Sequence, residues 1–134
     1  MIEIEYRRGE IQINESEFFP ATGSKMRHLL RTIRLNEAEF GIAQQISDHL
    51  CAEIKRTGNE LKMAKHKLNL AVDMVTDGPD RKKQKAQVNK RQAERKQLKR
   101  RLDALGRNLV VLKTMYGDML RYDAKVWEVL RNAD

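Results

Sequence analysis

The stretch LKMAKHKLNLAVDMVTDGPDRKKQKAQVNKRQAERKQLKRRL, residues 61–102, sets the topology of the chain, because it joins two helix-forming segments through a single strong break. At the centre of that break stands Asp77-Gly78-Pro79-Asp80. Glycine commonly ends a helix, and proline and aspartate are favoured where the next helix begins. A tight turn between two long helices makes them antiparallel neighbours, so we expect a helical hairpin.

A seven-residue apolar repeat runs on both sides of the break. Before it, the two inner positions of the repeat are Phe40, Ser47, Ile54, Leu61, Leu68 and Val75, and Ala43, Leu50, Thr57, Ala64 and Ala71. After it, they are Leu102, Leu109, Tyr116 and Leu130, and Leu98, Leu105, Leu112, Met119 and Val126. This pattern is typical of a coiled-coil seam. It predicts helices over about residues 37–76 and 81–132, the second roughly 80 Å long.

Small residues in the two segments suggest where the helices approach closely. Pairing the segments about the turn places Gly41 near Gly117 and Ala52 near Gly106. Small residues facing one another allow two helices to pack tightly, so we expect close contact at both points.

The first 36 residues are expected to form a small head. Apolar residues alternate with polar ones on both sides of Arg8-Gly9, which is typical of a β-hairpin with one buried face. A lone hairpin is marginally stable in water, so a cover is needed. Its expected apolar side chains are Ile2, Ile4, Tyr6, Ile11 and Ile13, with Phe18 and Phe19 as part of the cover.

A short helix is expected to follow, beginning at Ser24 as its N-cap. Its apolar stripe consists of Met26, Leu29, Leu30 and Ile33, and Asn36 closes it or caps the next helix. Trp127, Tyr122 and Leu130 are expected to meet the head. The predicted fold is therefore mainly α with a small β element. The head (1–36) packs at the base of a long antiparallel helical hairpin (37–134) whose basic tip lies around residues 55–101.

The amino-acid composition limits the classes of protein to which the chain can belong. The chain has 134 residues, 34% of them charged and 5% aromatic, with a formal net charge of +8. The length suggests one domain. A single cysteine, Cys51, fits a reducing compartment. No apolar run is long enough to span a bilayer and no secretory leader pattern opens the sequence, so we expect a soluble, cytoplasmic protein.

The basic excess is confined to the middle of the chain. Residues 1–54 carry 6 bases and 9 acids, residues 55–101 carry 16 bases and 5 acids, and residues 102–134 carry 5 of each. Within residues 81–101 there are 11 bases and one acid, Glu94. The seam also fades there, because Val88 is the only large apolar residue before Leu98, and Arg91 and Arg95 occupy inner positions of the repeat.

Such a charge block on a stiff helix predicts contact with the phosphate backbone of a nucleic acid. Residues 55–101 contain no Phe, Tyr or Trp, which argues against single-strand binding by base stacking and favours structured RNA or duplex DNA. In shape, a head with a basic coiled-coil arm is similar to tRNA-binding arms. The candidate binding residues are Lys55, Arg56, Lys62, Lys65, Arg81, Lys82, Lys83, Lys85, Lys90, Arg91, Arg95, Lys96, Lys99, Arg100 and Arg101.

Other interpretations remain open. The charge could serve only solubility on a structural coiled-coil oligomer, or meet an acidic protein surface. Size and composition are similar to small phage or mobile-element inhibitors, including some anti-CRISPR proteins, which would make the chain an inhibitor of a nucleoprotein complex. A second apolar stripe, Met63, Leu70 and Met74, suggests a homodimer or a docking surface, or else packing at the flank of the hairpin. Membrane-surface binding is disfavoured because the block lacks an apolar face.

No catalytic pattern stands out. His28, His49 and His66 show no metal-ligand spacing, and His49 and Cys51, two residues apart on a helix, fall on different faces. The glycines form neither a phosphate-binding loop nor a dinucleotide-binding motif. We therefore expect a non-enzymatic protein without a metal or cofactor.

Overall fold

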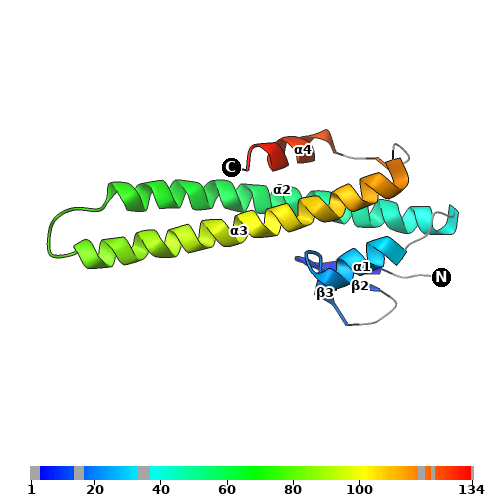
Figure 1. The fold of residues 1–134 in the computed structure, drawn as a ribbon, viewed down its shortest axis with the longest axis horizontal. Coiled ribbons are helices and arrows are strands. Elements are labelled where there is room, and N and C mark those ends of the chain that lie inside the picture. The colour runs from blue at the N-terminus through cyan, green and yellow to red at the C-terminus, as the bar shows by residue number, and fades with distance from the viewer. Residues whose placement is uncertain (1–3, 14–16, 33–36, 118–119, 122, 134) are drawn as a thin grey trace.

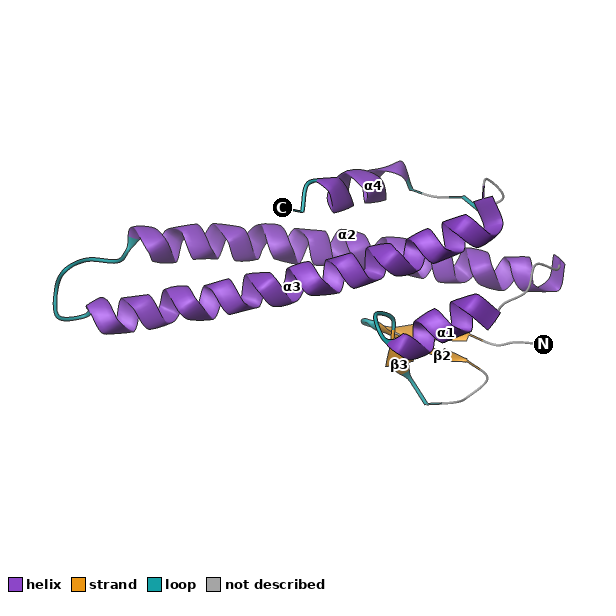
Figure 2. Ribbon diagram, viewed as in Figure 1, coloured by secondary structure: helices purple, strands orange, loops and turns teal. Residues whose placement is uncertain are grey.

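Two long antiparallel helices form the body of the molecule, as the sequence predicts. The computed structural model describes residues 4–13, 17–32, 37–117, 120–121 and 123–133. Helices α2 (Glu37–Asp73) and α3 (Arg81–Tyr116) pack against each other along their length (Figure 1). A small antiparallel sheet and the short helix α1 (Ser24–Thr32) lie on one side of this pair, and helix α4 (Ala124–Arg131) lies on the other (Figure 2).

The turn between the long helices is closed by local hydrogen bonds. The Gln84 side-chain oxygen accepts a bond of 2.8 Å from the backbone N–H of Thr76, and Arg81 forms an ion pair of 2.9 Å with Asp77. The backbone N–H of Arg81 donates to the carbonyl of Gly78. The break therefore lies where the sequence predicts it, although α2 ends at Asp73, three residues before its expected end.

The predicted seam is buried along most of α2 but only along the second half of α3. In α2 both inner positions of the repeat are buried throughout residues 43–68, including Ser47. In α3 burial begins at Leu102 and continues through Leu105, Leu109, Leu112 and Tyr116. Among residues 69–101, all of which the structure describes, none is buried. We call residues 69–101 the distal arm.

The expected continuous helix over residues 81–132 is wrong. Helix α3 ends at Tyr116, because Gly117 adopts a left-handed conformation (φ 57°) and its N–H bonds to the Lys113 carbonyl. The Asp123 side chain then caps a new helix by accepting from the Lys125 N–H at 3.0 Å. With 36 residues, α3 is about 54 Å long instead of about 80 Å.

Helix α4 folds back and occupies the space that glycines leave on α2 and α3. A Cβ built on Gly106 would lie 2.9 Å from the Leu130 side chain, and one on Gly58 would collide with Val129. The expected close pairs of small residues are wrong: a Cβ on Gly41 or Gly117 would meet nothing within 4 Å. Ala52 is exposed and does not pack against Gly106.

The head is a three-stranded sheet instead of a hairpin alone. Strands β1 (Ile4–Arg7) and β2 (Glu10–Ile13) pair through the expected two-residue turn, in which Gly9 has a φ of 73°. Strand β3 (Phe19–Pro20) adds to β2 and was not predicted. Proline is tolerated there because β3 is an edge strand. Ile11, at the centre of this sheet, is fully buried.

Helix α1 connects the sheet to the hairpin. The Gly23 carbonyl accepts from the Arg27 N–H, which makes Gly23 the N-cap and Ser24 the first helical residue. Met26 is fully buried, and Asn108 of α3 donates a 2.7 Å bond to the carbonyl of Ala21.

Helix α4, which carries Trp127 and Leu130, packs on α2 and α3, so the expected contact with the head is not found among the residues that the structure describes. Several predicted positions lie outside the described residues or side chains: Ile2, Ile4, Ile13, Leu29, Leu30, Ile33, Asn36, Phe40, Met119 and Tyr122. Within the described part of the chain, no helix combines the length and the apolar character that crossing a bilayer requires.

The close contact between Gly58 and α4 should affect the stability of substitutions at this glycine. Alanine favours helix by about 1 kcal/mol over glycine, so Gly41→Ala, in open space on the same helix, should raise the free energy of unfolding. The free energy of unfolding of Gly58→Ala should be lower than that of Gly41→Ala by roughly 1–3 kcal/mol, because the added methyl group collides with Val129.

Urea unfolding of both variants measures the difference. In a Val129→Ala background the penalty at Gly58 should disappear and the two substitutions should become equivalent. An unchanged penalty in that background would contradict the packing of α4 on α2.

Candidate functional site

The distal arm presents its bases on a surface that no apolar packing conceals. It carries 11 bases, all in α3, against Asp73, Asp77, Asp80 and Glu94. Three of the acids stand at the end of α2 and in the turn, so Glu94 is the one acid of the arm within α3. The bases of the distal arm therefore all lie along one helix, α3.

Four of the predicted binding residues in the arm form ion pairs. Arg81 pairs with Asp77 at 2.9 Å and Arg91 with Glu94 at 3.1 Å. The pair between Lys99 and Asp103 is 2.9 Å long, and Arg101 reaches Glu60 at 3.5 Å. The first three are pairs of neighbouring residues three or four positions apart and are weak, about 0.3–0.5 kcal/mol each, so they reduce the local charge without holding these bases rigidly.

The remaining seven predicted bases of the arm are exposed and form no ion pair within the described residues. They are Lys82, Lys83, Lys85, Lys90, Arg95, Lys96 and Arg100. From first to last they extend over about 27 Å of helix, comparable with about eight base-pair steps of a duplex. The period of the helix places Lys82, Lys85, Lys96 and Arg100 on the face opposite the buried seam.

The predicted residues on α2 have mainly structural contacts. Lys55 forms an ion pair with Asp123, the N-cap of α4. Lys65 donates a 3.1 Å bond to the carbonyl of Ala133, just beyond α4. Lys62 is exposed and lines a groove beside α4. Sequence reasoning missed these roles because they depend on α4 folding back against α2.

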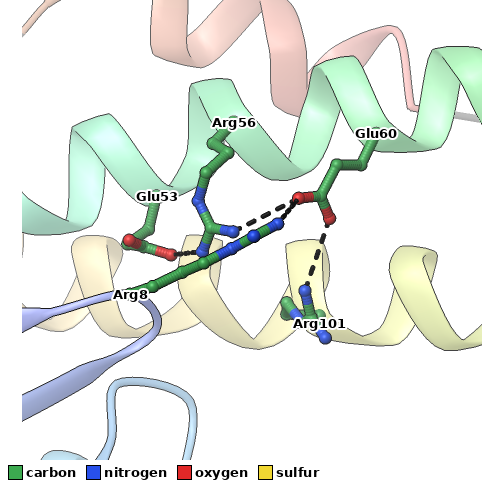
Figure 3. Close-up of polar contacts among 5 residues, drawn as sticks. All are labelled: Arg8, Glu53, Arg56, Glu60 and Arg101. Atoms are coloured by element: carbon green, nitrogen blue, oxygen red, sulfur yellow. Dashed lines mark hydrogen bonds and ion pairs between the residues drawn. The ribbon is translucent and has the colours of Figure 1, made fainter.

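A network of five charged residues fixes the base of the arm to the head (Figure 3). One oxygen of the Glu60 carboxylate accepts from Arg8 at 2.7 Å and from Arg56 at 3.2 Å, and the other lies 3.5 Å from Arg101. Arg56 also pairs with the buried Glu53. The network joins the β1–β2 turn, α2 and α3, so Arg56 and Arg101 are already held by carboxylates of the protein.

The single cysteine and its histidine neighbour lie in an environment that disfavours nucleophilic chemistry. Burial lowers the pKa of His49, partly offset by Glu53, and the ring of His49 stacks on Tyr6 at 4.5 Å between centroids. Burial also raises the pKa of Cys51, whereas an activated thiolate needs the opposite shift. Among the described residues, no group of three or more His, Cys, Asp and Glu side chains is placed to hold a metal ion.

The second apolar stripe is exposed. Met63, Leu70 and Met74 are 57%, 51% and 67% accessible to solvent. They therefore do not pack at the flank of the hairpin, which was one of the two interpretations of the sequence. Their exposure leaves a row of apolar side chains along α2 and at the residue just after its end, a composition suited to adaptable contacts.

Comparison with known protein families, curated proteins and solved structures finds no match for this chain.

The Glu60 network should contribute measurably to the stability of the fold. In Glu60→Gln, three arginines lose the carboxylate that they share, so the free energy of unfolding should fall by about 1–2 kcal/mol. Glu94→Gln removes one exposed pair from the distal arm and should change it by less than about 0.5 kcal/mol. Urea unfolding at low salt provides both values, and equal costs would show that the network does not hold the head.

Proposed function

We propose that this protein is a non-enzymatic nucleic-acid-binding protein whose distal arm lies along the phosphate backbone of structured RNA or duplex DNA. The observation that supports this most directly is the row of seven exposed bases on α3, between Lys82 and Arg100, which form no ion pair with any residue that the structure describes.

The physical basis is the release of counterions. Each phosphate that a lysine or arginine neutralises releases condensed cations, so affinity rises with the number of contacts and falls steeply with salt. A helix holds these bases at fixed spacing, and less conformational entropy is lost on binding than with a disordered basic tail. No sequence-specific contact is required for this mode of binding.

The absence of aromatic residues in positions 55–101 supports a structured target. Proteins that bind single strands without sequence preference usually stack bases on aromatic side chains. A face made of lysine and arginine alone is suited to the regular phosphates of a duplex or of folded RNA.

Removing charge from the outer face of α3 tests the proposal. The triple variant Lys82→Gln, Lys85→Gln, Lys96→Gln should weaken binding to duplex DNA or structured RNA, and it should lower the slope of log K against log salt by up to about 3. Fluorescence anisotropy across roughly 50–300 mM salt measures both quantities.

The matched control is Lys25→Gln, Arg121→Gln, Lys125→Gln, which removes the same charge from α1, the α3–α4 connection and α4. It should leave the slope nearly unchanged. Equal losses in the two triple variants would mean that net charge alone matters, and a flat salt response of the wild type would refute the proposal. Circular dichroism verifies that the helices are intact.

A second candidate function is supported by the exposed stripe of Met63, Leu70 and Met74. In this alternative the protein is an interaction or inhibitor module of the phage or mobile-element type, which blocks a nucleoprotein complex by binding its protein component. Exposed apolar rows of this kind are typical of protein contacts and have no role in binding phosphate.

Substituting the stripe separates the two functions. The triple variant Met63→Gln, Leu70→Gln, Met74→Gln keeps good helix formers in α2 and at the residue that follows it. If the second candidate is correct, a stoichiometric protein complex survives nuclease treatment with the wild type and is lost with this variant, while nucleic-acid affinity stays within about twofold.

The control is Val72→Gln, which removes an exposed apolar side chain (49% accessible) from the opposite face of α2. Light scattering of the same proteins distinguishes a second copy of the chain, as in a structural coiled-coil oligomer, from a different partner. A complex that disappears with nuclease would exclude the protein-binding alternative.

A further inference from the structure

A groove of about 930 Å³ lies along α3 where α1 and α4 flank it. Its floor is apolar and consists of Val110 and Val111 of α3 with Trp127 and Leu130 of α4. Val110 is 48% exposed, and the other three are only partly buried, so the described chain leaves this floor open to solvent. Figure 1 shows α1 and α4 on opposite sides of α3, and residues of all three helices line the groove.

The rim of the groove is positively charged. One arginine comes from each of its three helices: Arg27 from α1, Arg107 from α3 and Arg131 from α4. None of them forms an ion pair with a carboxylate of the described residues. Of the lining residues that the structure describes, Asp103 is the one acid, and it is paired with Lys99 at 2.9 Å.

We propose that this groove docks an acidic amphipathic helix of a partner protein. Apolar side chains on one face of such a helix would cover Val110, Val111 and Trp127, and its carboxylates would meet the three arginines. Arginine suits this role because its planar fork binds a carboxylate through two parallel hydrogen bonds. The recognition mode is that of a helix laid in an apolar groove.

The dimensions of the groove agree with this occupant. Between Asp103 and Val111 the axis of α3 rises by about 12 Å, which corresponds to about two helical turns. Gly106 contributes by allowing Leu130 to approach α3 closely, so that the floor is continuous between the two helices. A short helix with two or three apolar anchors fits this length.

A protein is favoured over a nucleic acid here because of the floor. Phosphates and sugars gain little from Val110, Val111 and Leu130, whereas burying an apolar surface contributes roughly 25 cal/mol per Å². The proposal does not rest on the nucleic-acid function of the distal arm, since none of the seven exposed bases of the arm lines this groove. The protein would then carry two sites along α3, one for each kind of partner.

Trp127 provides a direct measurement, because it is the single tryptophan of the chain and lines the groove. The probe is a synthetic, end-capped helical peptide of about four turns, free of aromatic residues, with leucines along one face and glutamates on both flanks. Titration of the full-length protein should shift the Trp127 emission to shorter wavelength and saturate with a Kd on the order of 10 µM. The same peptide with lysines in place of the glutamates should cause no shift.

Matched variants separate the groove from general charge. Arg107→Gln with Arg131→Gln should weaken peptide binding about tenfold, and Val110→Ser about fivefold. The controls remove the same groups elsewhere: Lys82→Gln with Lys85→Gln for the charge, and Val72→Ser for an equally exposed valine on α2. Both controls should stay within about twofold of the wild type.

Three results would overturn the proposal. The first is an unchanged Trp127 spectrum with the acidic peptide at about 1 mM. The second is equal weakening by the arm control and by the arginine variant, which would show non-specific attraction. The third is the same spectral shift with a duplex DNA of about 20 base pairs, together with a larger loss of DNA affinity for the arginine variant than for the arm control. That last result would assign the groove to nucleic acid.

Discussion

The buried seam between α2 and α3 is the contact on which every other part of the molecule depends. It is confined to residues 43–68 of α2 and begins at Leu102 in α3. The sheet and α1 pack on one side of it, and α4 packs on the other. On α2 the buried seam therefore runs almost to the end of the helix, whereas on α3 only the half from Leu102 onward is buried. The distal arm is therefore a continuation of helices that are anchored elsewhere.

This arrangement explains how a strongly basic segment can be helical. Starting a helix is costly, but extending one that already exists adds a hydrogen bond for each residue fixed. The seam supplies the existing turns, and pairs such as Arg91 with Glu94 relieve part of the repulsion along α3. Bases that would repel one another in an isolated peptide are held in a regular array. The core thus acts on the candidate site from a distance, through the rigidity of α3.

The sequence was sufficient to predict the hairpin, because its signals are local. The seven-residue repeat and the Asp77-Gly78-Pro79-Asp80 break are visible without knowledge of any partner, and the loss of burial toward the tip could be anticipated from Arg91 and Arg95. The error at the end of α3 has a physical reason. Val126 and Leu130 continue the same register whether α3 is straight or α4 folds back, so periodicity alone could not distinguish the two arrangements.

Contacts between distant segments were beyond the reach of sequence reasoning. Lys55 and Arg56 were included among the phosphate-binding candidates by charge alone, whereas the structure pairs them with Asp123, Glu53 and Glu60. The arginine-rimmed groove is a similar case, since Arg27, Arg107 and Arg131 are spread over three helices. The seven bases of α3 were identifiable because neighbouring residues on one helix remain neighbours in the fold. Charge on a single element can be predicted, and charge assembled from several elements cannot.

The coreless distal arm has a consequence for how the protein can change its reach. Adding one seven-residue repeat to each long helix at the turn end increases the length by about 10.5 Å and returns both helices to the same register. No side chain is buried beyond Leu68 in α2 or before Leu102 in α3, so after such an insertion the head, α4 and the groove would keep their contacts. The length of the arm is thus a variable separate from the stability of the fold. The length of the arm can therefore be matched to the spacing of contacts on a target without altering the core.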